Sequence, residues 1–223
     1  MIINFNKPAG MTSFGLVKKV RAITKERKVG HGGTLDPFAE GVLLIGTGKD
    51  TKRLSKFSNA DKSYSATLLL GKLTNTLDTE GEIIQEKSIP ELSENKIKKV
   101  LKLFLGESTQ IPPMFSAKKI NGVPLYRLAR KNIVVKRRPI NIKIFDAKLL
   151  KFSKSEISFS IKCSKGTYMR VIGKDLAEQL GTVGHLIKLV RTKVGDYSIQ
   201  KSTTMESFSK TWKSLNQKVH LNQ

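Results

Sequence analysis

The sequence contains few cysteines and few aromatic residues, and each shortage excludes a kind of site. Its one cysteine, Cys163, excludes an internal disulfide and any metal site built from several cysteines. Cys163 ends an alternating stretch that begins at Ile157, where a small hydrophobic residue facing the core is expected. Aromatic residues make up 7% of the chain, too few for a surface that stacks many bases in succession.

Long hydrophobic runs are also missing. No uninterrupted apolar stretch approaches the ~18 residues that cross a membrane. The amino terminus, Met1 to Pro8, lacks the basic and then apolar segments of a secretion signal. We therefore expect a cytoplasmic protein with no membrane attachment.

Acidic residues are scarce relative to basic ones. The 223 residues include 18 Asp and Glu against 41 Lys and Arg, which gives a net charge of +23. That charge exceeds what solubility requires and opposes compactness, so a polyanionic partner is expected. Nucleic acid fits better than a membrane surface, because the basic residues are spread along the chain without a basic amphipathic anchor. A generally basic proteome or a ribosomal setting would also account for the charge.

Hydrophobic patterning predicts a mixed α+β chain with no repeat or low-complexity linker. Expected strands cover residues 2–6, 42–45, 61–70, 83–84, 139–151 and 156–163, and a last apolar run covers 185–190. Expected helices cover residues 13–26, 49–57, 93–105 and 125–130, and a further helix after 166–170 ends at Gly181. In the first helix, Ser13 is the expected N-cap, and the apolar face is formed by Phe14, Val17, Val20 and Ile23.

The most informative stretch is the glycine-dense loop over residues 30–43. It places one carboxylate, Asp36, between a basic helical segment and an apolar run. Glycines permit close backbone approach to a ligand, and Pro37 favours an extended conformation at Asp36. The loop is therefore suited to presenting a single acid to a substrate, although an Asp-Pro turn that only joins two elements has the same local sequence.

Six blocks, in order between residues 4 and 197, resemble the signature blocks of TruB-type tRNA pseudouridine synthases. They are Asn6 to Ser13, His31 to Leu43, Asp61 to Ala66, Leu70-Gly71 with Thr74, Thr76, Asp78 and Gly81, Pro112 to Lys118, and Gly166 to Arg170. The resemblance implies an isomerase that converts uridine 55 in the TΨC loop of tRNA into pseudouridine after flipping the base out of the loop. It implies no cofactor, no metal and no protein partner; we expect a monomer that binds the T-arm of tRNA.

The resemblance also implies an architecture. It predicts the pseudouridine synthase fold, with a mixed, largely antiparallel sheet, flanking helices and a thumb-like insertion at about residues 107–140 that is mobile without RNA. The catalytic domain is expected over residues 1–206. Residues 207–223 are expected to be a short, polar tail, so that the PUA domain of many relatives is absent.

Three residues match the family's catalytic positions. Asp36 would act on the ribose as nucleophile or base, and the Arg170 guanidinium would keep its carboxylate ionised. Tyr64 would stack on the target base and bring its hydroxyl to the reacting uracil or ribose. By residue type alone, a strand tyrosine is more often part of the core.

Further positions are expected to contact the substrate. The expected binding residues are His31, Lys7, Tyr168, Leu189, Lys118 and Arg130. His31 would insert into the T-loop, Leu189 would line the pocket, and Lys7 would support the loop or a phosphate. Without the family context, His31 is equally compatible with a structural role and Leu189 with packing.

The chain departs from the family pattern at two positions. Asn132 replaces the glycine of an Ala-Arg-x-Gly sequence, and Asn tolerates the left-handed backbone that such a turn needs. Val190 replaces the first residue of an arginine pair, so that only Arg191 remains for a phosphate or backbone contact. Two other hypotheses stay open: a pseudouridine synthase with a different or broader RNA target, and a tRNA-binding folding chaperone.

Overall fold

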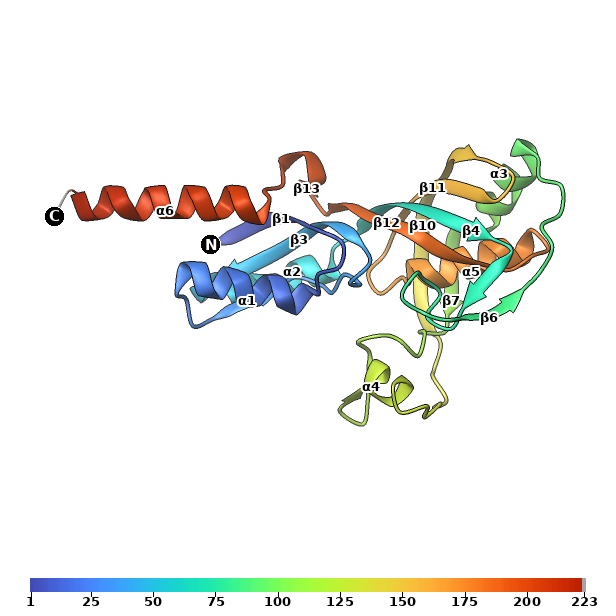
Figure 1. Ribbon diagram of the computed structural model, residues 1–223, viewed down its shortest axis with the longest axis horizontal. Helices are drawn as coiled ribbons and strands as arrows, with labels where there is room; N and C mark the ends of the chain where they lie inside the picture. Colours follow the sequence, from blue (N-terminus) through green and yellow to red (C-terminus); the bar gives the residue numbers. More distant parts are fainter. Residues whose placement is uncertain (222–223) are drawn as a thin grey trace. The chain divides into compact units, whose positions relative to one another are not determined.

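The computed structural model describes the backbone of residues 1–221 and the side chains of residues 1–214. The chain forms two compact units, which are labelled by element in Figure 1. Unit 1 comprises Met1–Lys62 and Val190–Gln223, and unit 2 comprises Ser63–Leu189.

Unit 1 is built around the strand β3 (Glu40–Thr47). β1 (Ile2–Lys7) pairs with β3 antiparallel, and the last residues of β12 (Gly184–Val194) pair with it in parallel. Two short strands pair antiparallel with their neighbours: β2 (Val29–His31) with β3, and β13 (Tyr197–Ser198) with β12. The helical segments of this unit are α1 (Ser13–Thr24), η1 (Gly48–Arg53), α2 (Leu54–Asn59), η2 (Ile199–Lys201) and α6 (Met205–Leu221).

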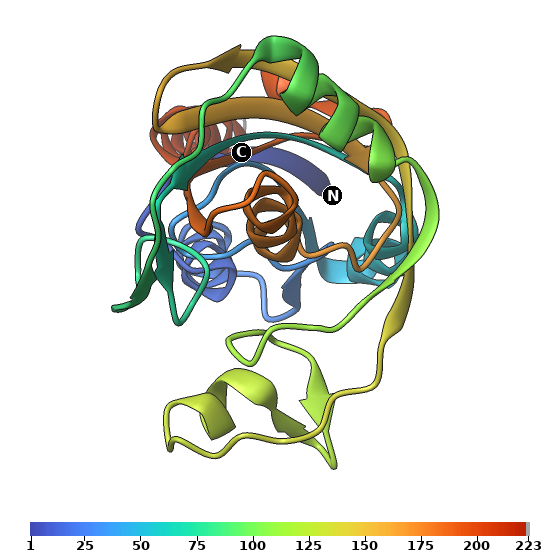
Figure 2. The same cartoon turned by 90° about the vertical axis from the view of Figure 1, so that its right-hand side faces the viewer.

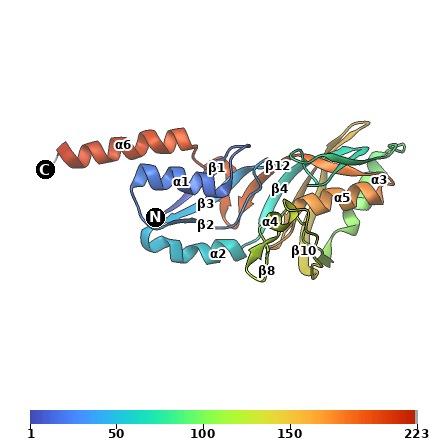
Figure 3. The ribbon, with the colours of Figure 1, turned by 60° about the horizontal axis from the view of Figure 1, so that its bottom comes forward.

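Both faces of β3 are buried, which explains its uninterrupted apolar sequence. Leu43 and Ile45 pack with residues of α1 and α6, whereas Val42 and Leu44 pack with residues of α2. Figure 3 shows α1 and α2 on opposite sides of β3. The buried strand predicted at residues 42–45 is confirmed and extends further in both directions.

Helix α1 differs from the prediction in two respects. Its N-cap is Thr12, whose side chain accepts a hydrogen bond from the Gly15 N–H, and Ser13 instead bonds to a loop. Phe14 was expected on the apolar face but is 54% exposed. Leu16 occupies the buried face together with Val17 and Val20, because these three residues face β3.

The carboxyl-terminal segment also differs from the prediction. Residues from 207 were expected to be a weakly patterned tail, but the backbone is helical over Met205–Leu221. Phe208 is buried against Phe5 with ring centroids 5.1 Å apart, and Trp212 packs against Phe208. Met205, Phe208 and Trp212 are spaced three and four residues apart, so they lie on one side of the helix and pack against the core of unit 1.

Unit 2 contains the strand order β12-β4-β11-β10-β7. The bounds are β4 (Lys62–Leu70), β7 (Gly106–Gln110), β10 (Ile140–Phe152) and β11 (Glu156–Cys163). β10 pairs antiparallel with β11 and β7, so the prediction of a mixed, largely antiparallel sheet is confirmed. Cys163 is buried, as predicted.

Two helices and a hairpin accompany these strands. Helix α3 (Glu94–Leu103) begins at the predicted cap, Ser93, and contacts β10. Helix α5 (Met169–Gln179) lies on the concave side of the curved strands in Figure 2. The hairpin consists of β5 (Lys72–Thr74) and β6 (Ile83–Glu86) and encloses a loop over residues 75–82.

The insertion leaves the sheet at a defined pair of residues. Gln110 on β7 pairs with Ile140 on β10, and the segment between them contains β8 (Lys119–Ile120), β9 (Val123–Pro124) and α4 (Leu125–Ala129). Figure 2 shows this segment extending away from the strands of unit 2. Residues 107–110 and 140 are paired in the sheet, so the segment outside the sheet covers residues 111–139. Asn132 has φ 57°, which confirms the left-handed turn.

Candidate active site

The loop that carries Asp36 connects β2 to β3 in unit 1 and is fixed on both sides of that residue. On its amino-terminal side, the Ser13 hydroxyl donates to the Leu35 carbonyl and accepts from the Leu35 N–H, at 3.0 and 2.9 Å. On its carboxyl-terminal side, the Gly10 N–H donates to the Pro37 carbonyl at 2.9 Å. The half-buried Asp36 is therefore held by a backbone with little freedom to move.

Lys7 is a fully buried cation that supports the same loop. Its ammonium donates to the carbonyls of Pro37 at 3.2 Å, Met11 at 2.6 Å and Pro8 at 2.8 Å. These bonds join the end of β1 and the start of α1 to the residue that follows Asp36. The observed contacts are those of loop support, one of the two roles expected for Lys7.

Arg191 is a second buried cation, and it binds the loop on the other side of Asp36. Its guanidinium donates to the carbonyls of Gly33 at 3.2 Å, Thr34 at 3.0 Å and Val42 at 2.7 Å. Because its side chain is 1% exposed, Arg191 makes the backbone contact and is not placed to meet a phosphate.

Gly41 allows Arg191 to lie close to β3. The two residues face each other in the parallel pairing of β12 with β3, and Gly41 has φ +109°. A Cβ at Gly41 would overlap the Arg191 carbonyl oxygen, so a larger residue would push the strands apart. Gly41 therefore permits the close spacing of β3 and β12 on which the hydrogen bonds of Arg191 to the loop depend.

His31 ends β2 and enters the loop. Burial is the main cause that lowers the pKa of its imidazole below 6.5, the positive charge of Arg191 lowers it further, and a backbone hydrogen bond with Gly33 acts in the opposite direction. His31 is therefore neutral at pH 7. Its Nδ1 is buried and has no hydrogen-bond partner among the residues that the structure describes.

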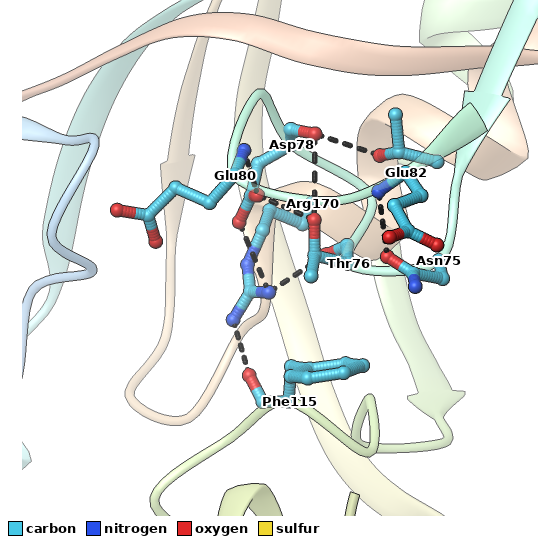
Figure 4. Close-up of polar contacts among 8 residues, drawn as sticks. Asn75, Thr76, Asp78, Glu80, Glu82, Phe115 and Arg170 are labelled. Atoms are coloured by element: carbon cyan, nitrogen blue, oxygen red, sulfur yellow. Dashed lines mark hydrogen bonds and ion pairs between the residues drawn. The ribbon is translucent and has the colours of Figure 1, made fainter. Parts of the chain in front are cut away.

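In unit 2, Arg170 lies in the first turn of α5 and organises the loop between β5 and β6 (Figure 4). Its guanidinium forms an ion pair with Asp78 at 3.2 Å, and both side chains are nearly inaccessible. It also donates to the Thr76 carbonyl at 2.8 Å. Asp78 accepts further bonds from the Thr76 hydroxyl at 2.6 Å and the Glu80 N–H at 3.0 Å, so this buried carboxylate has several donors.

The base of the insertion is bonded to the same end of α5. Arg170 donates to the Phe115 carbonyl at 2.7 Å. Gln110 and Tyr168 exchange two hydrogen bonds, in which the Gln110 amide donates to the Tyr168 carbonyl and accepts from the Tyr168 N–H. Three bonds therefore connect the start of α5 to residues 110–115.

The remaining predicted residues of unit 2 lie on different elements. Tyr64 is on β4 with its side chain 9% exposed, and Leu189 is buried on β12. Lys118 and Arg130 belong to the insertion, where the Arg130 guanidinium lies 5.6 Å from the centroid of the Tyr126 ring. Unit 1 thus places Lys7, at the end of β1, and His31, at the end of β2, beside the loop that carries Asp36, and unit 2 brings Tyr168 and Arg170 to one helix start.

Sequence reasoning gave no role to two residues that shape these groups, Asp78 and Gln110. For Arg191 it left a phosphate or a backbone contact open and did not indicate which backbone carbonyls the residue would bind. Asp78 was part of a recognised block, and its position in a loop rich in Thr, Asn and Gly was the available signal. The acceptors of Arg191 are backbone carbonyls, which leave no trace in the pattern of side chains.

The described part of the chain contains no helix long and apolar enough to cross a membrane. Within that part, no group of three or more His, Cys, Asp and Glu side chains is arranged to hold a metal ion.

Comparison with solved structures identifies the fold. A chain in the crystal structure of a Cbf5–Nop10–Gar1 complex superposes with a TM-score of 0.74 at 28% identity, over 94% of this chain and 53% of that one. A chain in the structure of an H/ACA RNP bound to a substrate RNA containing 2′-deoxyuridine gives a TM-score of 0.72 at 25% identity, over 96% and 55%.

Family models define the class. The model described as TruB family pseudouridylate synthase (N terminal domain) matches residues 21–169, and that of the tRNA pseudouridylate synthase B C-terminal domain matches residues 170–222. The fold and these matches define a pseudouridylate synthase, which is an isomerase.

The relatives narrow the class to one family. The tRNA pseudouridine synthase B of Hydrogenovibrio crunogenus is 43% identical over 92% of this chain and 68% of the relative. Those of Clostridium tetani and Protochlamydia amoebophila are 41% and 45% identical, over 93% and 89% of this chain and 72% and 76% of the relatives. The chain belongs to the TruB family of tRNA pseudouridine synthases, and it spans about two thirds to three quarters of the length of these relatives.

Proposed function

We propose that the chain converts uridine 55 in the TΨC loop of tRNA into pseudouridine and that Asp36 is the catalytic carboxylate. One observation carries the assignment of Asp36: the loop around it is fixed by Ser13, Lys7 and Arg191, and these contacts position a single acid. The family supplies the class of substrate, and the net charge of +23 favours a polyanion.

The proposed reaction is an internal transfer. The bond between uracil N1 and ribose C1′ breaks, the detached uracil rotates, and a bond forms between C5 and C1′. The C5 proton is lost and N1 gains a proton, so that the atoms balance and no oxidant, reductant or cofactor is needed. Asp36 acts either by attack on C1′ or by removal of a proton from the ribose.

Unit 2 supplies the other proposed catalytic groups. Arg170 stabilises the ionised carboxylate of Asp36, because a guanidinium remains charged and binds carboxylates with two parallel donors. Tyr64 stacks on the flipped uracil, and Tyr168 and Leu189 line its pocket. The base must leave the T-loop for the reaction, and His31 inserts there to support the space it vacates.

Basic residues provide the remaining affinity. Lys118 and Arg130 lie on the insertion, which we propose closes over the T-arm, and Lys7 supports the Asp36 loop from inside. Recognition depends more on the shape of the T-arm than on reading many bases. Phosphate contacts of this kind make binding steeply dependent on salt.

Purified protein incubated with an unmodified tRNA transcript tests the proposal, with the position of any pseudouridine mapped on the RNA. We expect modification at uridine 55, its loss in Asp36→Asn, and an unchanged tRNA dissociation constant in that variant. The matched control is Asp50→Asn, because Asp50 lies on η1 and pairs with Arg53 and the amino terminus. Full activity of Asp36→Asn would exclude Asp36 as the catalytic group. Modification at other uridines would favour a broader RNA target.

A further inference from the structure

Phe14 is an aromatic residue on the outer face of α1, where the sequence pattern predicts a buried one. Its side chain is 54% exposed, whereas Leu16, Val17 and Val20 of the same helix are buried. Single exposed apolar residues are common on protein surfaces, so exposure alone assigns no role. Places where a local sequence rule fails are, however, often functional sites, and two further observations concern Phe14.

The first observation is a cation held at the ring. The Lys18 ammonium lies 5.3 Å from the centroid of the Phe14 ring, one helical turn along α1. Arg21 follows seven residues after Phe14, on the same side of the helix; it is exposed and donates to the Val29 carbonyl at 3.4 Å. Lys25, also exposed, is the left-handed C-cap that follows the helix. The outer face of α1 therefore presents one aromatic ring at its start, followed by the positive charges of Lys18 and Arg21.

The second observation is the connection of Phe14 to the Asp36 loop. Phe14 follows Ser13, whose hydroxyl makes both hydrogen bonds to Leu35, and Leu35 precedes Asp36. All of these residues belong to unit 1, so the connection lies within one compact unit. The two hydrogen bonds between Ser13 and Leu35 thus fix the start of α1, which carries the Phe14 ring, to the loop that carries Asp36.

We propose that Phe14 and Lys18 form a nucleotide-binding element in which the Phe14 ring stacks on an unpaired base of the bound tRNA and Lys18 contacts a phosphate of the same strand. The proposal rests on the proposed function, because its ligand is the tRNA substrate. RNA is the expected occupant, because an aromatic ring can stack on a base and the adjacent Lys18 and Arg21 complement the charge of a phosphate backbone. One ring is sufficient, since the element holds one base.

Phe14→Leu tests the stacking, because leucine keeps the apolar surface and the helix propensity but removes the ring. We expect the KM for tRNA to rise about tenfold, as for other single stacking positions, while kcat stays within about twofold and the melting temperature is unchanged. Phe14→Tyr keeps an aromatic ring at this position, so its KM should equal that of the native protein. Lys18→Gln should reduce the slope of log affinity against log salt by about one, and Phe14→Leu should leave that slope unchanged.

The chain provides a matched control in unit 2. Phe145 is 42% exposed and has the Lys162 ammonium 5.6 Å from its ring centroid, so it has the same chemistry without the connection to the Asp36 loop. Phe145→Leu should leave KM unchanged. Equal KM values for Phe14→Leu and the native protein, or equal losses in Phe14→Leu and Phe145→Leu, would overturn the inference.

Direct binding separates this inference from the proposed function. If the native protein forms no pseudouridine in tRNA, the proposed function fails, and the dissociation constants of native protein and Phe14→Leu for tRNA still decide the inference. Weaker binding by Phe14→Leu supports it, and equal binding overturns it.

Discussion

Replacement of Arg191 by glutamine tests whether a buried cation shapes the Asp36 loop. The guanidinium donates to three backbone carbonyls, and the shorter glutamine amide leaves most of them without a donor. Each buried acceptor without a donor costs about 1–3 kcal/mol, so we expect the free energy of unfolding to fall by about 3 kcal/mol. For a chain of this length, that loss lowers the melting temperature by about 6–12 °C.

The loss of activity should exceed what the lower stability explains. Gly33 and Thr34, which accept two of the three bonds, precede Asp36 in the loop by three and two residues. A displacement of about 1 Å at a catalytic group costs about 100-fold in rate, so kcat should fall by at least that factor at a temperature where the variant is fully folded. Arg191→Lys keeps the charge but cannot reach carbonyls that lie apart, and it should give an intermediate result.

Thermal unfolding by circular dichroism and single-turnover kinetics measure the two effects. Arg53→Gln is the matched control, because Arg53 is exposed and bonds only to Asp50 among the contacts described for it. We expect this control to match the native protein in both assays. An Arg191→Gln protein with the native melting temperature and native kcat would refute the role of Arg191.

Three other substitutions test the surroundings of the site. Lys7→Met removes the donor to three carbonyls and should lower the urea midpoint of unfolding by an amount comparable to Arg191→Gln. Because the pKa of His31 is lowered, its contribution to stability is complete above pH 6.5 and is lost as the pH falls from 6.5 through the folded-state pKa. His31→Gln should therefore flatten the dependence of melting temperature on pH below 6.5. Asp78→Asn leaves the Arg170 charge buried with a weaker partner and should cost about 3 kcal/mol in thermal unfolding, whereas Asp146→Asn, which alters an exposed ion pair, should have no measurable effect.

Much of the fold could be predicted because its strands carry local periodicity. β4 alternates buried and half-buried residues along its whole length, and β3 is apolar throughout its centre because both faces are covered. β7 was not predicted: its sequence, Gly106–Gln110, is polar, and it becomes a strand by pairing with β10. Tertiary pairing of that kind overrides local propensity.

The candidate site could be predicted only in part for a related reason. Asp36 was recognisable because glycines and a proline surround it in the chain. The contacts that fix its loop come from Ser13 and Arg191, which are 23 and 155 positions away in the sequence and act on backbone carbonyls and an N–H. Such acceptors are the same at every residue, so the sequence does not reveal which one a distant side chain will bind.

Buried cations explain why the net charge alone overstates the surface available to RNA. Lys7, Lys62 and Arg191 are at least 93% buried, and each donates to three backbone carbonyls. These carbonyls belong to loops or helix ends, except that of Val42 in β3. Backbone groups in an irregular loop need partners that regular secondary structure does not supply, and a long cationic side chain provides several donors at once. In unit 1, the buried Lys7 and Arg191 therefore fix the loop that carries Asp36, and the buried Lys62 fixes the end of α2. Exposed cations such as Lys18 remain available to phosphate.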